Sequence, residues 1–256
     1  MEKSLEVDKA VVEFLLRMGD NTLVLGHRIS EWCGHSPVLE EDIALANQAL
    51  DLIGQTQLWL ELAGALENKG RSADQLAFLR EAWDFRNVLL VEKDNGDFGN
   101  TMMRQFLFDA WHIEMLKALL KSSNSQIAEI AAKAVKEVAY HLEKSADIVI
   151  RLGDGTELSH QRMQHALDNL WSYTGELFVD DDYDEVVNSA GIAPLPSSLK
   201  HKWDQTINSV LRDATLALPQ TSYVHRGGKK GQHTEFLGHM LAEMQFLQRA
   251  YPGSTW

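Results

Sequence analysis

The segment EWCGH, residues 31–35, places a glutamate, a cysteine and a histidine within five positions. These residue types bind metals in many proteins, so the segment raises the question of a metal centre. Cys33 is the only cysteine of the chain, whereas zinc sites built on thiolates gather two to four. We therefore expect Cys33 to be a small buried hydrophobic residue. His35 precedes Ser-Pro and is expected in the turn after a helix.

Four acidic residues lie at helical spacing among apolar ones, where core side chains are expected. A lone carboxylate is costly to bury, so each of them needs a partner. One acid on each of four long helices is the plan of a carboxylate-bridged di-iron centre, in which two helices each give Glu and two each give Glu-x-x-His. The four residues are Asp20, Asp51, Asp109 and Glu137.

The two histidines of that plan are absent. The residue three positions after Asp51 is Gly54. Three positions after Glu137 lies Tyr140, and His141 comes one position late. Without both nitrogen ligands, the acids make a poor iron(II) site.

Asp109 does have His112 three positions later, but on a helix where the plan needs no histidine. We therefore interpret the four acids as degenerate former metal positions that hold no metal. An intact metal site remains the alternative. The acids are expected to form a buried polar network with Arg28, Arg104, Lys133 or histidines.

The elements that position these residues are helices, because apolar residues recur with helical periodicity along most of the chain. Long helices on short links predict a helix bundle. The second helix carries the apolar positions Ile43, Ala46, Leu50, Ile53 and Leu60. The stretch DDDYDE, residues 180–185, is expected to form a turn, and residues 191–198 a loop. Helices are expected at about 8–33, 42–68, 73–91, 101–120, 125–152, 159–178, 199–216 and 234–251.

Composition narrows the class of protein further. With 256 residues, 45% of them hydrophobic, the chain can bury a sizeable core. Its formal charge of −13 argues against nucleic acid as a partner. No apolar run is long enough to span a membrane. The single cysteine and an N-terminus without a secretion signal favour the cytoplasm.

Four long motifs stand out along the chain: RMGDNTLVLGHRISEWCGHSPVLEEDIALANQALDLIGQ, DAWHIEMLKALL, AKAVKEVAYHLEKSADIVIRLGDGT and GGKKGQHTEFLGHMLAEMQFLQRAYPG. Together they resemble the C subunits of bacterial phenylacetyl-CoA epoxidases, also called ring 1,2-phenylacetyl-CoA monooxygenases. The similarity extends over nearly the whole chain and the motifs occur in order, which makes the resemblance more specific than any single pattern.

The resemblance implies an all-α, ferritin-like bundle formed by one domain over residues 1–256, with its core at about 8–152 and C-terminal helices at about 157–252. It implies a structural, non-catalytic subunit of a multicomponent oxygenase that epoxidises phenylacetyl-CoA in aerobic phenylacetate breakdown. The di-iron centre is then expected in a partner A subunit, with no cofactor in this chain and with a separate reductase. A homodimer stays open. The alternative is a ferritin-like di-metal oxidase or metal-storage protein.

The resemblance also implies that two segments approach phenylacetyl-CoA where the subunits meet. In the first, Phe85 and Asn87 match the family, whereas Asp84 and Arg86 depart from it. The second segment matches poorly. The alternative is that Phe85 belongs to the core and Asn87 to a helix surface. The implied contacts are Asp84, Phe85, Arg86, Asn87, Glu185, Val186 and Val187.

The loop GGKKG, residues 227–231, is a basic run in an acidic chain. Glycine-rich backbone at a helix start favours anions, so Lys229 and Lys230 are candidates for docking a phosphate or an acidic partner. A turn with solvated lysines is the alternative. His233, Glu235 and His239 follow, but the first two face different ways on a helix and do not form a metal site.

Overall fold

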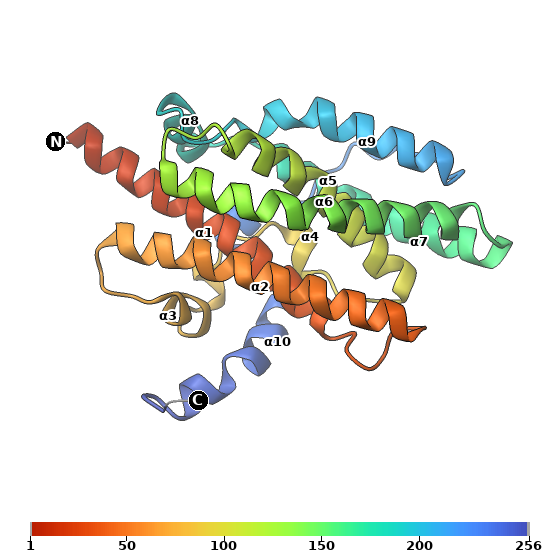
Figure 1. The fold of residues 1–256 in the computed structure, drawn as a ribbon, viewed down its shortest axis with the longest axis horizontal. Helices are drawn as coiled ribbons and strands as arrows, with labels where there is room; N and C mark the ends of the chain where they lie inside the picture. Colours follow the sequence, from red (N-terminus) through yellow and green to blue (C-terminus); the bar gives the residue numbers. More distant parts are fainter. Residues whose placement is uncertain (1, 255–256) are drawn as a thin grey trace.

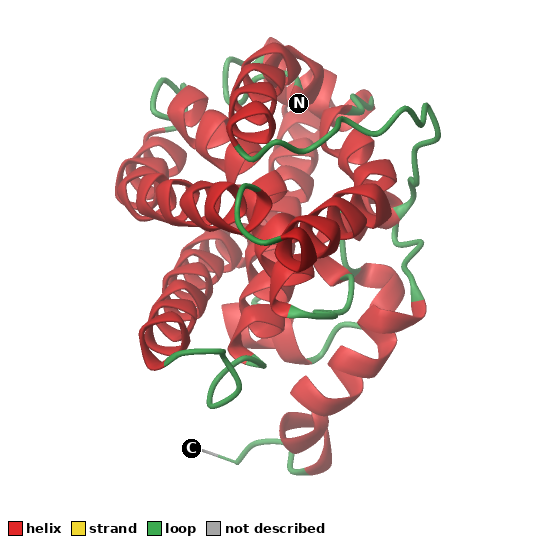
Figure 2. Ribbon diagram, turned by 90° about the vertical axis from the view of Figure 1, so that its right-hand side faces the viewer, coloured by secondary structure: helices red, strands yellow, loops and turns green. Residues whose placement is uncertain are grey.

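The bundle is built on four long helices. The computed structural model describes residues 2–254, with side chains from residue 7, and every regular element in that range is helical (Figure 2). Helices α1 and α2 form one closely packed pair, and α5 and α6 form the other. In Figure 1, α2 and α6 run across the front of the view. The four helices are α1 (Glu2–Ser30), α2 (Leu39–Glu67), α5 (Phe98–Leu119) and α6 (Ser125–Gly153).

Helix α5 is the centre of the molecule. Every residue from Thr101 to Leu116 is buried, including the charged and polar ones. Helices α6, α7 (Glu157–Thr174) and α9 (Lys200–Asp213) all pack against it. A helix surrounded in this way must satisfy its polar side chains inside the bundle, which makes α5 the place to look for buried chemistry.

The prediction of a continuous helix at about 73–91 is wrong. The segment forms α3 (Ala73–Phe78), the 3-10 helix η1 (Ala82–Asp84) and α4 (Leu89–Glu92), with extended backbone between the last two. The buried carboxylate of Asp20, on α1, accepts a hydrogen bond from the backbone N–H of Arg86 at 2.8 Å. This tertiary contact holds the backbone out of the helical conformation.

The C-terminal third contains more short elements than its periodicity predicts. The predicted acidic turn is wrong in part, since it continues as a helix, α8, capped by Asp181, whose carboxylate accepts from two backbone N–H groups. The helix predicted at about 199–216 is continuous but shorter, as α9, whereas the helix predicted at about 234–251 is interrupted at Gln245. The elements are η2 (Gly175–Phe178), α8 (Asp182–Ser189), η3 (Pro196–Leu199), η4 (Gly228–Lys230), α10 (Glu235–Met244) and α11 (Phe246–Ala250).

Helix α2 leaves exposed three of the five apolar positions that mark it in the sequence, Ile43, Leu50 and Ile53. Ile43 is 53% exposed and Leu50 is 67% exposed. Leu60 is the one of these positions that is fully buried. The other fully buried side chains on the interior face of α2 include Leu45 and Trp59, which the predicted pattern did not contain. Helix α2 is therefore apolar on two opposite sides, and one side faces outward. None of the helices in residues 2–254 combines the length and apolar character of a membrane span.

Candidate functional site

The carboxyl group of Asp109 lies in the middle of the bundle and is bonded to neutral groups. Its Oδ1 accepts from Nε2 of Gln105 at 2.7 Å, and its Oδ2 accepts from Oγ of Ser145, on α6, at 3.0 Å. Burial raises the pKa of Asp109 to about 8. The group is therefore largely protonated at neutral pH.

Two histidines lie next along the seam between α5 and α6. His112 is fully buried, and neither of its ring nitrogens has a hydrogen-bond partner among the described residues. Burial lowers the pKa of His112 to about 3, and nearby His141 adds to that effect. Burial also lowers the pKa of His141, against the opposing effect of Asp51, whose Oδ2 lies 2.9 Å from its Nε2. Both rings are therefore neutral at physiological pH.

The other two acids have partners of different kinds. Glu137, on α6, accepts from Nε2 of Gln55 at 2.9 Å. Asp20 is fully buried and binds the guanidinium of Arg80, 60 residues further along the chain. Asp20 thus faces residues 80–86, and Glu137 faces α2, so neither acid contacts Asp109.

The expected basic partners of these acids are mostly wrong. Arg28 donates to the backbone carbonyl of Glu92, and Arg104 donates to backbone carbonyls of the loop before α5. Lys133 is exposed. Only the expectation of a histidine is confirmed, by the contact between His141 and Asp51.

The residues on the inner faces do not fit a di-iron centre. Within residues 2–254, no group of three or more His, Cys, Asp or Glu side chains has the arrangement to hold a metal ion. The two carboxyl oxygens of Asp109, where a bridging carboxylate would lie, accept hydrogen bonds from an amide and a hydroxyl, neither of which is a usual iron ligand. The imidazoles of His112 and His141 do not converge with Asp109 on a shared position.

The prediction that Cys33 is buried is wrong, because the thiol is exposed. Helix α1 ends at Ser30, and Cys33 follows in a turn whose backbone N–H groups donate to carbonyls of the last helical turn. The carboxylate of Glu31 forms an ion pair with Arg28, whose Nη1 lies 2.9 Å from its Oε1. The EWCGH segment is therefore a helix-ending turn at the surface.

A second cluster lies where residues 86, 181–183 and 229–230 meet α1. A cavity of about 340 Å³ opens there between acidic and basic side chains. Residues 84–87, the acidic stretch 180–185 and the GGKKG loop each stand out separately in the sequence. No pattern in the sequence predicts that the three segments meet at one cavity. The lining residues are Glu13, Arg17, Arg86, Asp181, Asp182, Tyr183, Lys229 and Lys230.

Most charges of this cluster neutralise one another. Arg17 binds Asp181 at 2.7 Å and Asp184 at 3.2 Å. Nζ of Lys229 donates to Asp184 at 2.8 Å and to the carbonyl of Val179 at 2.8 Å. Lys229 therefore anchors its loop to α8 instead of pointing into solvent, whereas Lys230 is exposed.

Glycines let the GGKKG loop touch the irregular segment after α3. A Cβ atom on Gly228 would clash with the carbonyl oxygen of Asn87, and one on Gly231 with that of Trp83. Gly231 also has φ +76°, which other residues rarely adopt. The loop therefore packs directly against the backbone of residues 83–89.

The residues implied to approach phenylacetyl-CoA lie at different depths. Phe85 is fully buried, with the Arg80 guanidinium 4.3 Å from its ring centroid. Asn87 is fully buried and donates to Oε2 of Glu92 at 3.0 Å. Val187 is buried, and Val186 is partly buried. Asp84, Arg86 and Glu185 reach the surface, and of these Arg86 lines the cavity.

Two buried acids that sequence reasoning missed fix this region. Glu92 accepts from Nδ1 of His233 at 2.8 Å and from the backbone N–H of Thr234 at 2.6 Å. Glu176 accepts from the backbone N–H groups of Leu89 and Gly227, each at 2.8 Å. Their partners lie up to 142 residues away in sequence, so no local pattern marks them.

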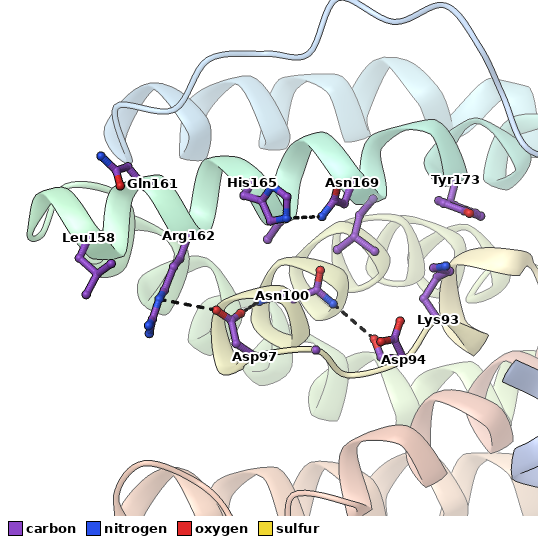
Figure 3. Close-up of a pocket in the computed structure, with 13 residues that line it drawn as sticks. Lys93, Asp94, Asp97, Asn100, Leu158, Gln161, Arg162, His165, Asn169 and Tyr173 are labelled. Carbon is purple, nitrogen blue, oxygen red and sulfur yellow. Dashed lines mark hydrogen bonds and ion pairs between the residues drawn. The ribbon is translucent and has the colours of Figure 1, made fainter.

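A further cavity, of about 700 Å³, opens between α7 and the loop before α5 (Figure 3). Its charged groups have both signs, and Arg162 faces Asp97 at 4.0 Å. His165 lies 2.9 Å from the amide of Asn169 on the same helix. Among the described residues, these contacts leave no converging set of catalytic groups on its wall.

Helix order and the two helix pairs define a ferritin-like bundle, and within residues 2–254 no group of potential ligands is arranged to hold a metal ion. The model of a family described as "Phenylacetic acid catabolic protein" matches residues 2–256, and the chain belongs to that family. It is similar to the C subunit of the 1,2-phenylacetyl-CoA epoxidase of Escherichia coli (strain K12). The two are 48% identical over 243 residues, covering 95% of this chain and 98% of the relative.

Proposed function

We propose that the chain is a non-catalytic subunit of a phenylacetyl-CoA epoxidase, where it pairs with and supports a catalytic A subunit that carries the di-iron centre. The observation that supports this role most directly is the surroundings of Asp109, whose two carboxyl oxygens accept hydrogen bonds from Gln105 and Ser145 where a di-iron centre requires metal ligands. The name and high identity of the relative supply the reaction.

A bundle without its metal can serve such a complex by its rigidity. A di-iron subunit must exclude water and hold a shaped channel for its substrate. The continuous apolar core of this chain and its buried ion pairs make it a stiff body that can cover and brace a partner. Phenylacetyl-CoA is long enough to touch both subunits. Among residues 84–87, which the family resemblance places near this ligand, Arg86 lines the cavity of about 340 Å³.

The test is an epoxidase assay of the A subunit and its reductase with and without this chain. We expect product formation to depend on the chain. The Asp109→Asn variant should restore it as fully as the wild-type chain does, because Asn keeps the shape and hydrogen bonds of the neutral acid. Full activity of the A subunit alone would contradict the supporting role. Loss of turnover in Asp109→Asn, with binding intact, would favour the alternative of a di-metal oxidase.

A further inference from the structure

The outward side of α2 carries a row of apolar residues, and its three large side chains are exposed among the described residues. We call it the outer stripe, made of Leu39, Ile43, Ala46, Leu50 and Gly54. Leu39 is 70% exposed, Ile43 53% and Leu50 67%. Apolar residues exposed singly are ordinary, but a contiguous row at helical spacing marks a contact surface.

Gly54 supplies an independent sign that a partner approaches this face. Glycine lowers the stability of a helix interior relative to alanine, so it usually has a packing reason there. A Cβ atom on Gly54 would have no atom of the described residues within 4 Å. Nothing within that part of the chain requires the glycine, whereas a helix packed closely on the outer stripe would.

The apolar surface continues from the outer stripe to α6. A groove of about 420 Å³ lies between the C-terminal half of α2 and the N-terminal half of α6. Its floor includes Leu62 and Ile130, and its lining also contains the charged residues Glu61, Glu129 and Lys133. Tyr140, on α6, is 57% exposed. Exposed tyrosine beside aliphatic side chains is typical of protein interfaces. Figure 1 shows α2 and α6 side by side on this face.

The charges around the outer stripe indicate what covers it. Helix α2 contains six acidic residues and no Lys, Arg or His. Glu41 is paired with Lys144 at 2.7 Å, and Asp51 contacts His141. Glu40 and Glu61 are exposed and have no basic partner among the described side chains. A second copy of the chain would set acid against acid, whereas a partner with basic side chains beside its apolar face would complement the rim.

We propose that the outer stripe docks the catalytic partner subunit through an apolar helix face of that subunit bordered by lysine and arginine. This inference rests on the proposed function and adds the surface and the chemistry of the pairing. Exposed acids steer association, and the central aliphatic side chains supply most of the affinity.

The experiment measures the affinity of the purified A subunit for the full chain by calorimetric titration. Leu50→Glu and Ile43→Glu should each weaken binding at least about 30-fold, as expected for central interface residues. Leu158→Glu is the matched control, since Leu158 is 59% exposed on α7, away from α2. It should bind as the wild-type chain does. The double variant Glu40→Lys/Glu61→Lys should weaken binding about threefold to tenfold and reduce its dependence on salt.

The outcomes separate the two proposals. If the wild-type chain binds the A subunit and Leu50→Glu binds it equally tightly, the docking surface is wrong and the proposed function stands. If the wild-type chain does not bind the A subunit, the proposed function fails and the docking surface fails with it. Sedimentation of the chain alone provides a further check. Self-association that Leu50→Glu abolishes would make a second copy the occupant and overturn the proposal.

Discussion

Replacing Arg80 with alanine will destabilise the chain by about 3–5 kcal/mol, because it leaves the buried carboxylate of Asp20 without its charge partner. Asp20 is fully buried, and Arg80 is 4% exposed. Arg80 also donates to the carbonyl of Asp84 at 3.1 Å and lies over the ring of Phe85. The substitution thus loosens α1 from residues 80–86 as well as removing an ion pair.

Urea unfolding of the wild-type and Arg80→Ala chains measures this effect. Arg212→Ala is the control, since the Arg212 side chain is 74% exposed and should change stability by less than about 0.5 kcal/mol. The double variant Asp20→Asn/Arg80→Met should recover part of the loss, because it removes the uncompensated charge. A loss below about 1 kcal/mol in Arg80→Ala would show that the pair does not hold the segment.

Replacing Asp109 with asparagine will stabilise the chain increasingly as the pH rises from 5 to 8. The pKa of Asp109 is about 8 in the folded chain and 3.8 when unperturbed. Between these values the folded state binds one more proton than the unfolded state, so the stability of the wild type falls with rising pH. The asparagine amide exchanges no proton in this range. The difference between variant and wild type should therefore grow by up to about 1.4 kcal/mol per pH unit, on the order of a few kcal/mol in total.

The measurement is the difference in unfolding free energy between Asp109→Asn and wild type at pH 5, 6, 7 and 8. Taking the difference cancels the contributions of other groups, including the two buried histidines. Asp213→Asn is the control, because this carboxylate is half exposed and its variant should show a nearly constant difference from wild type. A constant difference for Asp109→Asn would mean that Asp109 is ionised in the folded chain, as a metal ligand would be.

Periodicity predicts the long helices well because each buries a long apolar face against another helix. Helices α1, α2, α5 and α6 lie close to their expected ranges. The break after α3 could not be predicted, since it depends on Asp20 and Arg80, which are 60 residues apart. The apolar positions of α2 were misleading for a physical reason. Periodicity reports that a face avoids water, but it does not say whether the same chain or another covers it.

For the polar residues, too, local spacing predicts the position on a helix but does not predict the partner. Helical spacing placed Asp109 and Glu137 on inner faces, and the absence of Glu-x-x-His pairs argued against iron. The partners of the acids were not predictable, because Gln55, Ser145 and Arg80 lie on other helices or loops. Glu92 and Glu176 escaped notice because they bind backbone N–H groups of distant loops.

The metal content of the purified chain tests the central claim most directly. The chain would be prepared from iron-replete cells, in parallel with the A subunit as a positive control, and both would be analysed for transition metals. We predict no stoichiometric metal in this chain and iron in the A subunit. Two iron atoms per chain, lost together in Asp109→Asn, would contradict the proposal of a non-catalytic partner.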